Sequence, residues 1–119
     1  MTYSHHAFIS YCWFATKHRP REQFRYWVCN SFKPLLEEHL IRNLSGFRSV
    51  FVDQDCKTEA GYRNQIAEAY HKSAVLIPIL DSQYFDSPWC RAEWAGFVSR
   101  EQQTGNSQLI YSFWSIQRN

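Results

Sequence analysis

The stretch AVLIPIL, residues 74–80, carries no charged or hydrogen-bonding side chain. Successive side chains of a strand point to opposite faces, so a strand of this composition is buried on both faces. Central strands of parallel sheets, which are covered by helices on both sides, have this pattern. Residues 62–72 before it and 87–103 after it show apolar residues at helical spacing. The stretch therefore predicts the middle of a wound α/β sheet.

The rest of the chain extends this pattern in both directions. The segments HAFISY (6–11), FRSVFVD (47–53) and QLIYSFW (108–114) are rich in strand-forming residues. Between the first two, residues 22–44 have the spacing of a helix, which we expect Pro34 to kink or break, because proline in a helix interior costs about 3 kcal/mol. The order β-α-β-α-β-α-β predicts a central parallel sheet with right-handed crossovers and helices on both faces.

Length and composition indicate one folded domain. With 119 residues, 45% of them hydrophobic and 18% aromatic, the chain is long enough and apolar enough to form a core. A net charge of +2 with dispersed charges gives no strong case for nucleic acid or a membrane as partner. The chain ends soon after the last strand with no helix to cover it, so we expect residues 1–119 to be cut from a longer multidomain protein, with a C-terminal helix missing.

The cysteine pattern and the N-terminus indicate a reducing compartment. Cys12, Cys29, Cys56 and Cys90 show no CxxC or zinc-site spacing, so we interpret them as free thiols. There is neither a signal peptide nor an apolar stretch of about 20 residues. The sequence therefore predicts a cytoplasmic domain.

The segment SPWCRAEW, residues 87–94, raises the question of function. Ser followed by Pro is typical of a helix start, and this register places Trp89, Glu93 and Phe97 on one face. Glu93 thus lies in an apolar stripe, close to the carboxyl ends of the strands, where such sheets bind ligands. Two interpretations stay open: a functional carboxylate, or an ordinary one that reaches solvent or pairs with an arginine at position 63, 91 or 100.

Several segments in this order resemble the Toll/interleukin-1 receptor (TIR) domain family, in its bacterial form. They are AFISY (7–11), VFVD (50–53), TEAG (58–61), SAVLIPIL (73–80) and S-x-Y-x-x-S-x-WC-x-x-E (82–93), of which the last is the most specific. The resemblance spans residues 6 to about 114 and implies a flavodoxin-like three-layer α/β fold.

The resemblance also implies one of two functions, because TIR domains include adaptors and enzymes that share the fold. In the NAD⁺-cleaving branch, the catalytic residue corresponds to Glu93. A carboxylate there would stabilise the oxocarbenium-like ribose that forms when the nicotinamide–ribose bond breaks. NAD⁺ is then the substrate, and no cofactor is needed. The product is ADP-ribose or a cyclic ADP-ribose, and the sequence does not decide between them.

By the same resemblance, Tyr11, Trp13, Glu59 and Trp89 fall on substrate-binding positions. For Trp89, stacking on the substrate and plain core packing stay open. Glu59 is equally open to interpretation as a solvated loop carboxylate, and Tyr11 as an aromatic residue at a strand end. Trp13 departs from the family, some of whose enzymes have a basic residue thereabouts. The pyrophosphate contact would then fall to Arg19, Arg21 or Arg63.

For the biological role, the resemblance implies an effector of bacterial antiphage immunity. Such domains assemble with other copies of themselves, here through residues 53–61, when a fused or associated sensor domain responds to infection. The alternative is a non-enzymatic adaptor that acts by homotypic association of TIR domains.

Overall fold

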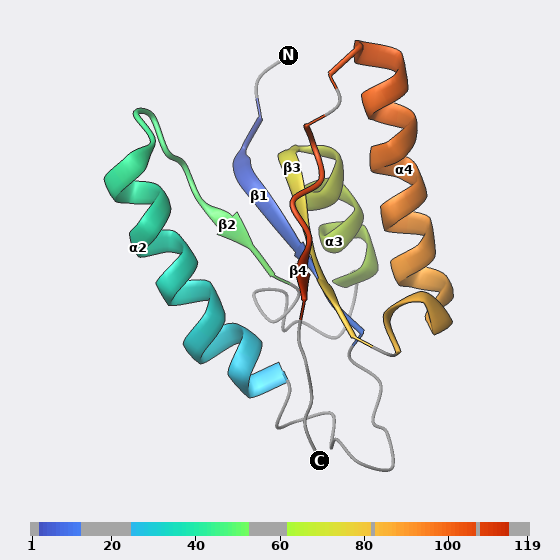
Figure 1. The fold of residues 1–119 in the computed structure, drawn as a ribbon, viewed down its shortest axis with the longest axis horizontal. Coiled ribbons are helices and arrows are strands. Elements are labelled where there is room, and N and C mark those ends of the chain that lie inside the picture. Colours follow the sequence, from blue (N-terminus) through green and yellow to red (C-terminus); the bar gives the residue numbers. More distant parts are fainter. Residues whose placement is uncertain (1–2, 13–24, 53–61, 82, 107, 115–119) are drawn as a thin grey trace.

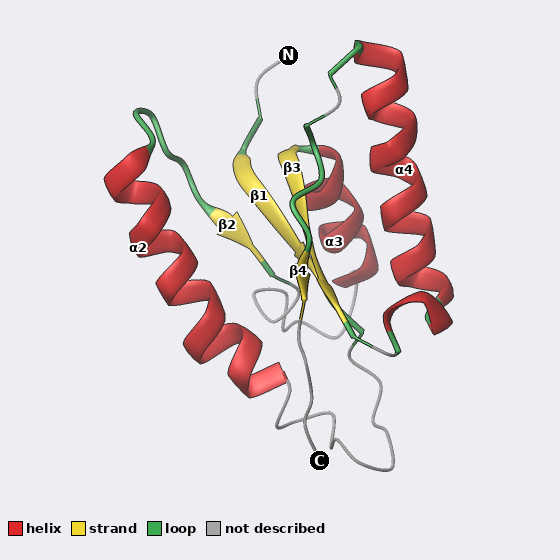
Figure 2. Ribbon diagram, viewed as in Figure 1, coloured by secondary structure: helices red, strands yellow, loops and turns green. Residues whose placement is uncertain are grey.

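The computed structural model describes residues 3–12, 25–52, 62–81, 83–106 and 108–114. Its strands are β1 (His5–Ser10), β2 (Val50–Phe51), β3 (Ser73–Leu80) and β4 (Phe113–Trp114). All pair in parallel, in the order β2-β1-β3-β4, and the helices lie on both sides of the sheet (Figures 1 and 2). This is the flavodoxin-like α/β fold that the sequence predicts.

Alternation along β1 decides which side chains meet which helix layer. Ala7 and Ile9 belong to the buried cluster on the side of α2 (Lys33–Asn43), together with residues of the preceding helical turns. Phe8 belongs to the cluster on the opposite side, with residues of α3 (Tyr62–His71) and α4 (Pro88–Thr104). Ser10, two residues after Phe8, therefore also faces the layer that contains α4.

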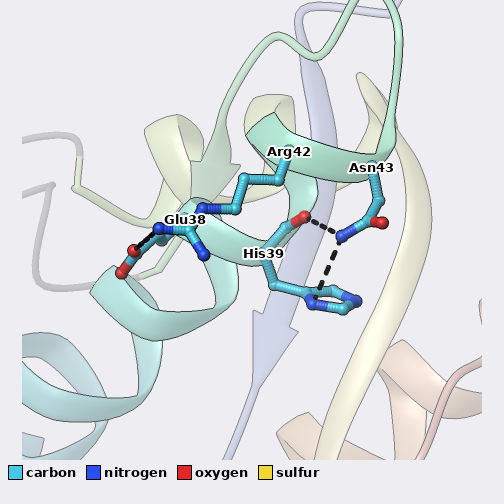
Figure 3. A network of polar contacts seen from close by, with 4 residues as sticks. All are labelled: Glu38, His39, Arg42 and Asn43. Atoms are coloured by element: carbon cyan, nitrogen blue, oxygen red, sulfur yellow. Dashed lines mark hydrogen bonds and ion pairs between the residues drawn. The ribbon is translucent and has the colours of Figure 1, made fainter.

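The sequence predicts a kink or a break at Pro34 in the helix of residues 22–44, and the structure shows no break, because residues 25–43 are helical throughout. Residues 28–32 form a π-helical turn, η1 (Val28–Phe32), and the Lys33 N–H bonds to the Val28 carbonyl. Pro34 is the second residue of α2 and lies just after this turn, so the helix passes the proline with a local change in its hydrogen-bond pattern. Further along α2, on its exposed side, Arg42 forms an ion pair with Glu38 at 2.8 Å. The neighbouring residues Asn43 and His39 are joined by hydrogen bonds at the same i,i+4 spacing (Figure 3).

The start and end of α4 follow from its sequence. The Ser87 side chain accepts a hydrogen bond from the Cys90 N–H, and Pro88 occupies the first helical position. The helix ends at Gly105, whose φ of 72° is a left-handed conformation that glycine adopts without strain. The predicted N-terminus of this helix is thus confirmed.

The two outer strands are shorter than the sequence predicts. The predicted strand 47–53 is described as far as residue 52, and within it only Val50–Phe51 form β2. Of 108–114, only Phe113–Trp114 form β4, preceded by an isolated bridge between Leu76 and Ile110. An outer strand has one neighbour to pair with, so its length depends on how far that neighbour runs beside it. Residue composition carries no information about this.

Gly96 lies where α4 is crossed by Tyr70 of α3. The Tyr70 hydroxyl donates a hydrogen bond to the Glu93 backbone oxygen at 2.9 Å. A Cβ atom at position 96 would overlap this hydroxyl. Alanine normally stabilises a helix relative to glycine by about 1 kcal/mol. Here we expect Gly96→Ala to lower the free energy of unfolding by about 1–3 kcal/mol, as overpacking does, and urea denaturation measures this.

The control is the same substitution without the hydroxyl. In a Tyr70→Phe background the nearest ring atom lies 3.2 Å from the added Cβ, a tight contact that small shifts relieve. Gly96→Ala is then expected to cost at least 1 kcal/mol less, about the size of typical coupling energies between residues in contact. Equal costs in both backgrounds would show that Tyr70 does not limit the space at position 96.

A candidate active site around Glu93

Glu93 is a buried carboxylate in the second turn of α4. Its exposed fraction is 8%, and the helix buries Cys90 and Phe97 along with it. A charged side chain is rarely buried to this degree unless hydrogen bonds compensate for the lost water. The contacts of its two oxygens therefore decide what the residue can do.

Among the described residues, two side-chain donors from different elements hold the Glu93 carboxylate. Ser10, at the end of β1, donates its hydroxyl to Oε1 at 2.7 Å. Trp89, one turn earlier on α4, donates its indole Nε1–H to Oε2 at 2.8 Å. Hydrogen bonds to an ionised acceptor are about twice as strong as those between neutral groups. The arrangement thus stabilises a negative charge at a fixed place.

Two of the three arginines considered as partners of Glu93, Arg91 and Arg100, donate hydrogen bonds to backbone carbonyls elsewhere. Arg91 donates to the Phe85 carbonyl at 2.9 Å, and Arg100 donates to the Ser73 carbonyl at 2.7 Å while its guanidinium lies over the Phe97 ring. The Arg63 side chain lies outside the described residues. For Arg91 and Arg100, the interpretation of Glu93 as the partner of an arginine is therefore wrong, and so is the interpretation that it reaches solvent.

Glu93 opens onto a small cleft at the carboxyl end of β1. The cleft has a volume of about 10 Å³, close to the space that one water molecule needs. Residues of β1, α3 and α4, and Tyr11 after β1, line it: Phe8, Ile9, Ser10, Tyr11, Ile66, Trp89 and Glu93. Three of the predicted site residues, Tyr11, Trp89 and Glu93, thus meet here.

The other predicted site residues cannot be placed. Trp13 and Glu59, together with Arg19 and Arg21, lie outside the described residues.

Trp89 differs from a core residue, because 37% of it is exposed and its indole N–H is directed at Glu93. Tyr11 is buried at 3% exposure and packs in the cluster on the α2 side as well.

Two further residues contact the site and were not proposed from the sequence. Tyr84, in the short helix η3 (Tyr84–Asp86), is fully buried, and its hydroxyl lies 2.6 Å from the Ser10 hydroxyl. The signal for Ser10 is a hydroxyl directly after the apolar residues 7–9 of β1, since a buried hydroxyl needs a partner. Nothing in the sequence names that partner.

Cys90 is buried beside this site, and burial raises the pKa of its thiol from 9.0 to about 12, opposed by a hydrogen bond with Ser87. A folded-state pKa above the unfolded value favours the protonated folded state. The resulting stabilisation is fully present below about pH 9 and is lost as the pH rises towards 12. Cys12 and Cys29 are also free thiols, and Cys56 lies outside the described residues.

This burial predicts that Cys90 is chemically inert in the folded domain. The reactive form of cysteine is the thiolate, and both the raised pKa and an exposure of 1% suppress its attack. We expect iodoacetamide at pH 8 to leave Cys90 unmodified, as detected by peptide mass spectrometry, until urea unfolds the chain. Cys29, which is only partly buried, is the internal comparison. Labelling of Cys90 as fast as Cys29 under native conditions would contradict its burial.

Neither a metal-ligand cluster nor a membrane-spanning helix occurs among the residues that the structure describes. Among these residues, no three His, Cys, Asp or Glu side chains come together as metal ligands would. No helix in the described ranges is both long enough and apolar enough to cross a lipid bilayer.

The fold and the site together define a class of protein. The domain is a doubly wound parallel α/β domain with a buried, hydrogen-bonded carboxylate at the edge of the sheet where such folds bind ligands. Residues 8–115 match the family model of the TIR domain, so the chain belongs to the TIR domain family. No curated protein matches it. The family contains NAD⁺ glycohydrolases and non-enzymatic adaptors, and membership alone is compatible with both.

Proposed function

We propose that this domain is an NAD⁺ glycohydrolase that cleaves the bond between nicotinamide and ribose. The observation that carries the proposal is the Glu93 carboxylate, buried at 8% exposure and held by two side-chain donors beside a cleft. Buried ionisable groups with specific partners beside a cleft are concentrated at functional sites, which favours an enzyme over an adaptor.

The chemistry of the proposed reaction suits a fixed negative charge. The C1′–N1 bond breaks and its electron pair goes to the pyridinium nitrogen, so that neutral nicotinamide leaves and positive charge develops on the ribose. Glu93 stabilises this charge electrostatically, and its effect is enlarged because the surroundings are poor in water. Water then attacks C1′ and loses a proton to give ADP-ribose, or the adenine ring attacks to give a cyclic product.

The residues around Glu93 are proposed to bind the substrate. The exposed part of the Trp89 ring offers a stacking surface, for which base–aromatic stacking energies are about 1–3 kcal/mol. Tyr11, Trp13 and Glu59 complete the proposed set. A cleft of about 10 Å³ does not hold a nicotinamide ring, so substrate binding requires it to widen. We propose that assembly with other copies of the domain provides this step.

The proposed setting is the cytoplasm of a bacterium, where the domain acts as an effector in antiphage immunity. Its partners are NAD⁺, other copies of the domain, and a fused or associated sensor domain that triggers assembly. Neither nucleic acid nor a membrane is a proposed partner, and NAD⁺ enters as substrate without a resident cofactor.

The test is NAD⁺ consumption by the domain clustered on a surface or fused to an oligomerising module, so that lack of assembly cannot hide activity. Release of nicotinamide, with the second product identified by mass spectrometry, supports the proposal and separates a linear from a cyclic product. Intact NAD⁺ in the presence of a clustered, folded domain overturns it. The adaptor function then takes its place, and binding between copies becomes the activity to measure.

A further inference from the structure

Three side chains from three elements form a buried chain of hydrogen bonds that ends on Glu93. The Tyr84 hydroxyl lies 2.6 Å from the Ser10 hydroxyl, which in turn lies 2.7 Å from Glu93 Oε1. Tyr84 is on η3, Ser10 is on β1 and Glu93 is on α4. The exposed fractions are 0% for Tyr84, 1% for Ser10 and 8% for Glu93, so these hydrogen bonds are shielded from water.

The direction of these hydrogen bonds follows from the number of hydrogens available. A serine hydroxyl has one hydrogen, and Ser10 donates it to Glu93 Oε1. The hydrogen between Ser10 and Tyr84 must therefore come from the tyrosine. The order is Tyr84 O–H to Ser10 Oγ–H to Glu93 Oε1, and successive donors of this kind polarise one another.

We propose that Ser10 and Tyr84 are positioning residues that hold the Glu93 carboxylate in one orientation and favour its ionised form. This inference deepens the proposed function and rests on it, because the positioned group is the proposed catalytic carboxylate. Trp89 fixes the other oxygen from the side of the cleft. The carboxylate is thus held from its own helix and from the sheet, so the sheet edge and α4 must keep their relative position for the site to work.

Among the described residues, the titratable groups beside Glu93 do not change charge in acid. Four such groups face Glu93 in the described part of the polypeptide: Tyr11 at the end of β1, Tyr70 on α3, Tyr84 on η3 and Cys90 on α4. Burial raises the pKa of Tyr70 and of Cys90 to about 12 and raises that of Tyr84 as well. These three groups stay neutral throughout acid and neutral pH.

The test compares Ser10→Ala with Ser73→Ala in the clustered domain. Ser73 is a matched control, because it is also fully buried, lies at the opposite end of the sheet and donates one hydrogen bond of 2.7 Å, to the Ala69 carbonyl. Ser10→Ala is expected to lower kcat about 10-fold with little change in KM, and to move the acid limb of the pH–rate profile up by about one unit. Ser73→Ala is expected to lower stability alone.

A second readout does not depend on activity. The Trp89 indole N–H donates to Glu93, so its NMR resonance reports the ionisation of that carboxylate. Its titration midpoint is expected to rise by about one pH unit in Ser10→Ala, to rise less in Tyr84→Phe, which keeps the ring packing, and to stay unchanged in Ser73→Ala. If Ser10→Ala does not fold, Tyr84→Phe carries the test by itself.

The outcomes separate this inference from the proposed function. A shifted indole midpoint in a domain that leaves NAD⁺ intact supports the hydrogen-bonded chain and overturns the glycohydrolase. An active domain in which Ser10→Ala and Tyr84→Phe keep the wild-type midpoint and acid limb overturns the positioning role and leaves the glycohydrolase standing.

Discussion

Replacing Glu93 by Gln is expected to reduce nicotinamide release by the clustered domain at least about 10²–10³-fold, the usual effect of removing one electrostatic stabiliser of a transition state. Glutamine has the shape of glutamate without its charge. It still accepts a hydrogen bond from one of Trp89 and Ser10, so the fold is expected to survive. Single-turnover measurements of nicotinamide release, with thermal unfolding of the same sample, separate lost chemistry from lost structure.

The matched control for this substitution is Glu101→Gln. Glu101 lies two turns further along α4, and its carboxylate accepts a hydrogen bond from the Leu109 N–H at 3.0 Å. The same loss of charge at that position is expected to change nicotinamide release less than 2-fold, since electrostatic effects weaken with distance and exposure. If both variants kept wild-type activity, Glu93 would not be the catalytic residue.

Phe97→Ala is expected to lower the free energy of unfolding by about 3–5 kcal/mol, the usual cost of removing a fully buried phenylalanine. Phe97 has an exposed fraction of 0% and meets the Tyr70 ring edge to face at 5.1 Å between centroids. The Arg100 guanidinium lies over the ring, 4.1 Å from its centroid. Urea denaturation monitored by circular dichroism measures the change.

Phe85→Ala removes the same group from η3, where 45% of the side chain is exposed. Less buried apolar surface is lost there, so the expected decrease in the free energy of unfolding is smaller, about 1 kcal/mol. If Phe97→Ala cost no more than Phe85→Ala, then α4 would not be fixed to the sheet through Phe97. The position of Glu93, one turn before it, would need another explanation.

The central part of the fold could be predicted because its signals are local. A strand buried on both faces shows this in its composition, and β3 occupies Ser73–Leu80 where AVLIPIL predicts it. The start of α4 could be predicted from Ser87 and Pro88, which are the N-cap and the first helical residue. The interruption near Pro34 could be predicted but its form could not, because a π-helical turn differs from a break only in how the following amides pair.

The site could be predicted in part, for the same reason. Periodicity on one helix places Glu93 in an apolar stripe and puts Trp89 one turn away. The hydrogen bond between Glu93 and Ser10 joins residues 83 positions apart in the sequence, and that between Ser10 and Tyr84 joins residues 74 positions apart. No spacing within a sequence predicts such pairs, since they depend on which strand end lies beside which helix in the folded domain.

The outer strands of the sheet bear on how copies of the domain recognise one another. Within the described residues, β2 and β4 have two residues each, so they present few unpaired backbone groups to another chain. In the proposed assembly, these two described strands offer a neighbouring copy little backbone with which to continue the sheet, so side chains would carry most of the recognition along them. Recognition of that kind changes with single surface residues, so related domains in one cell can diverge into separate assemblies without altering their folds.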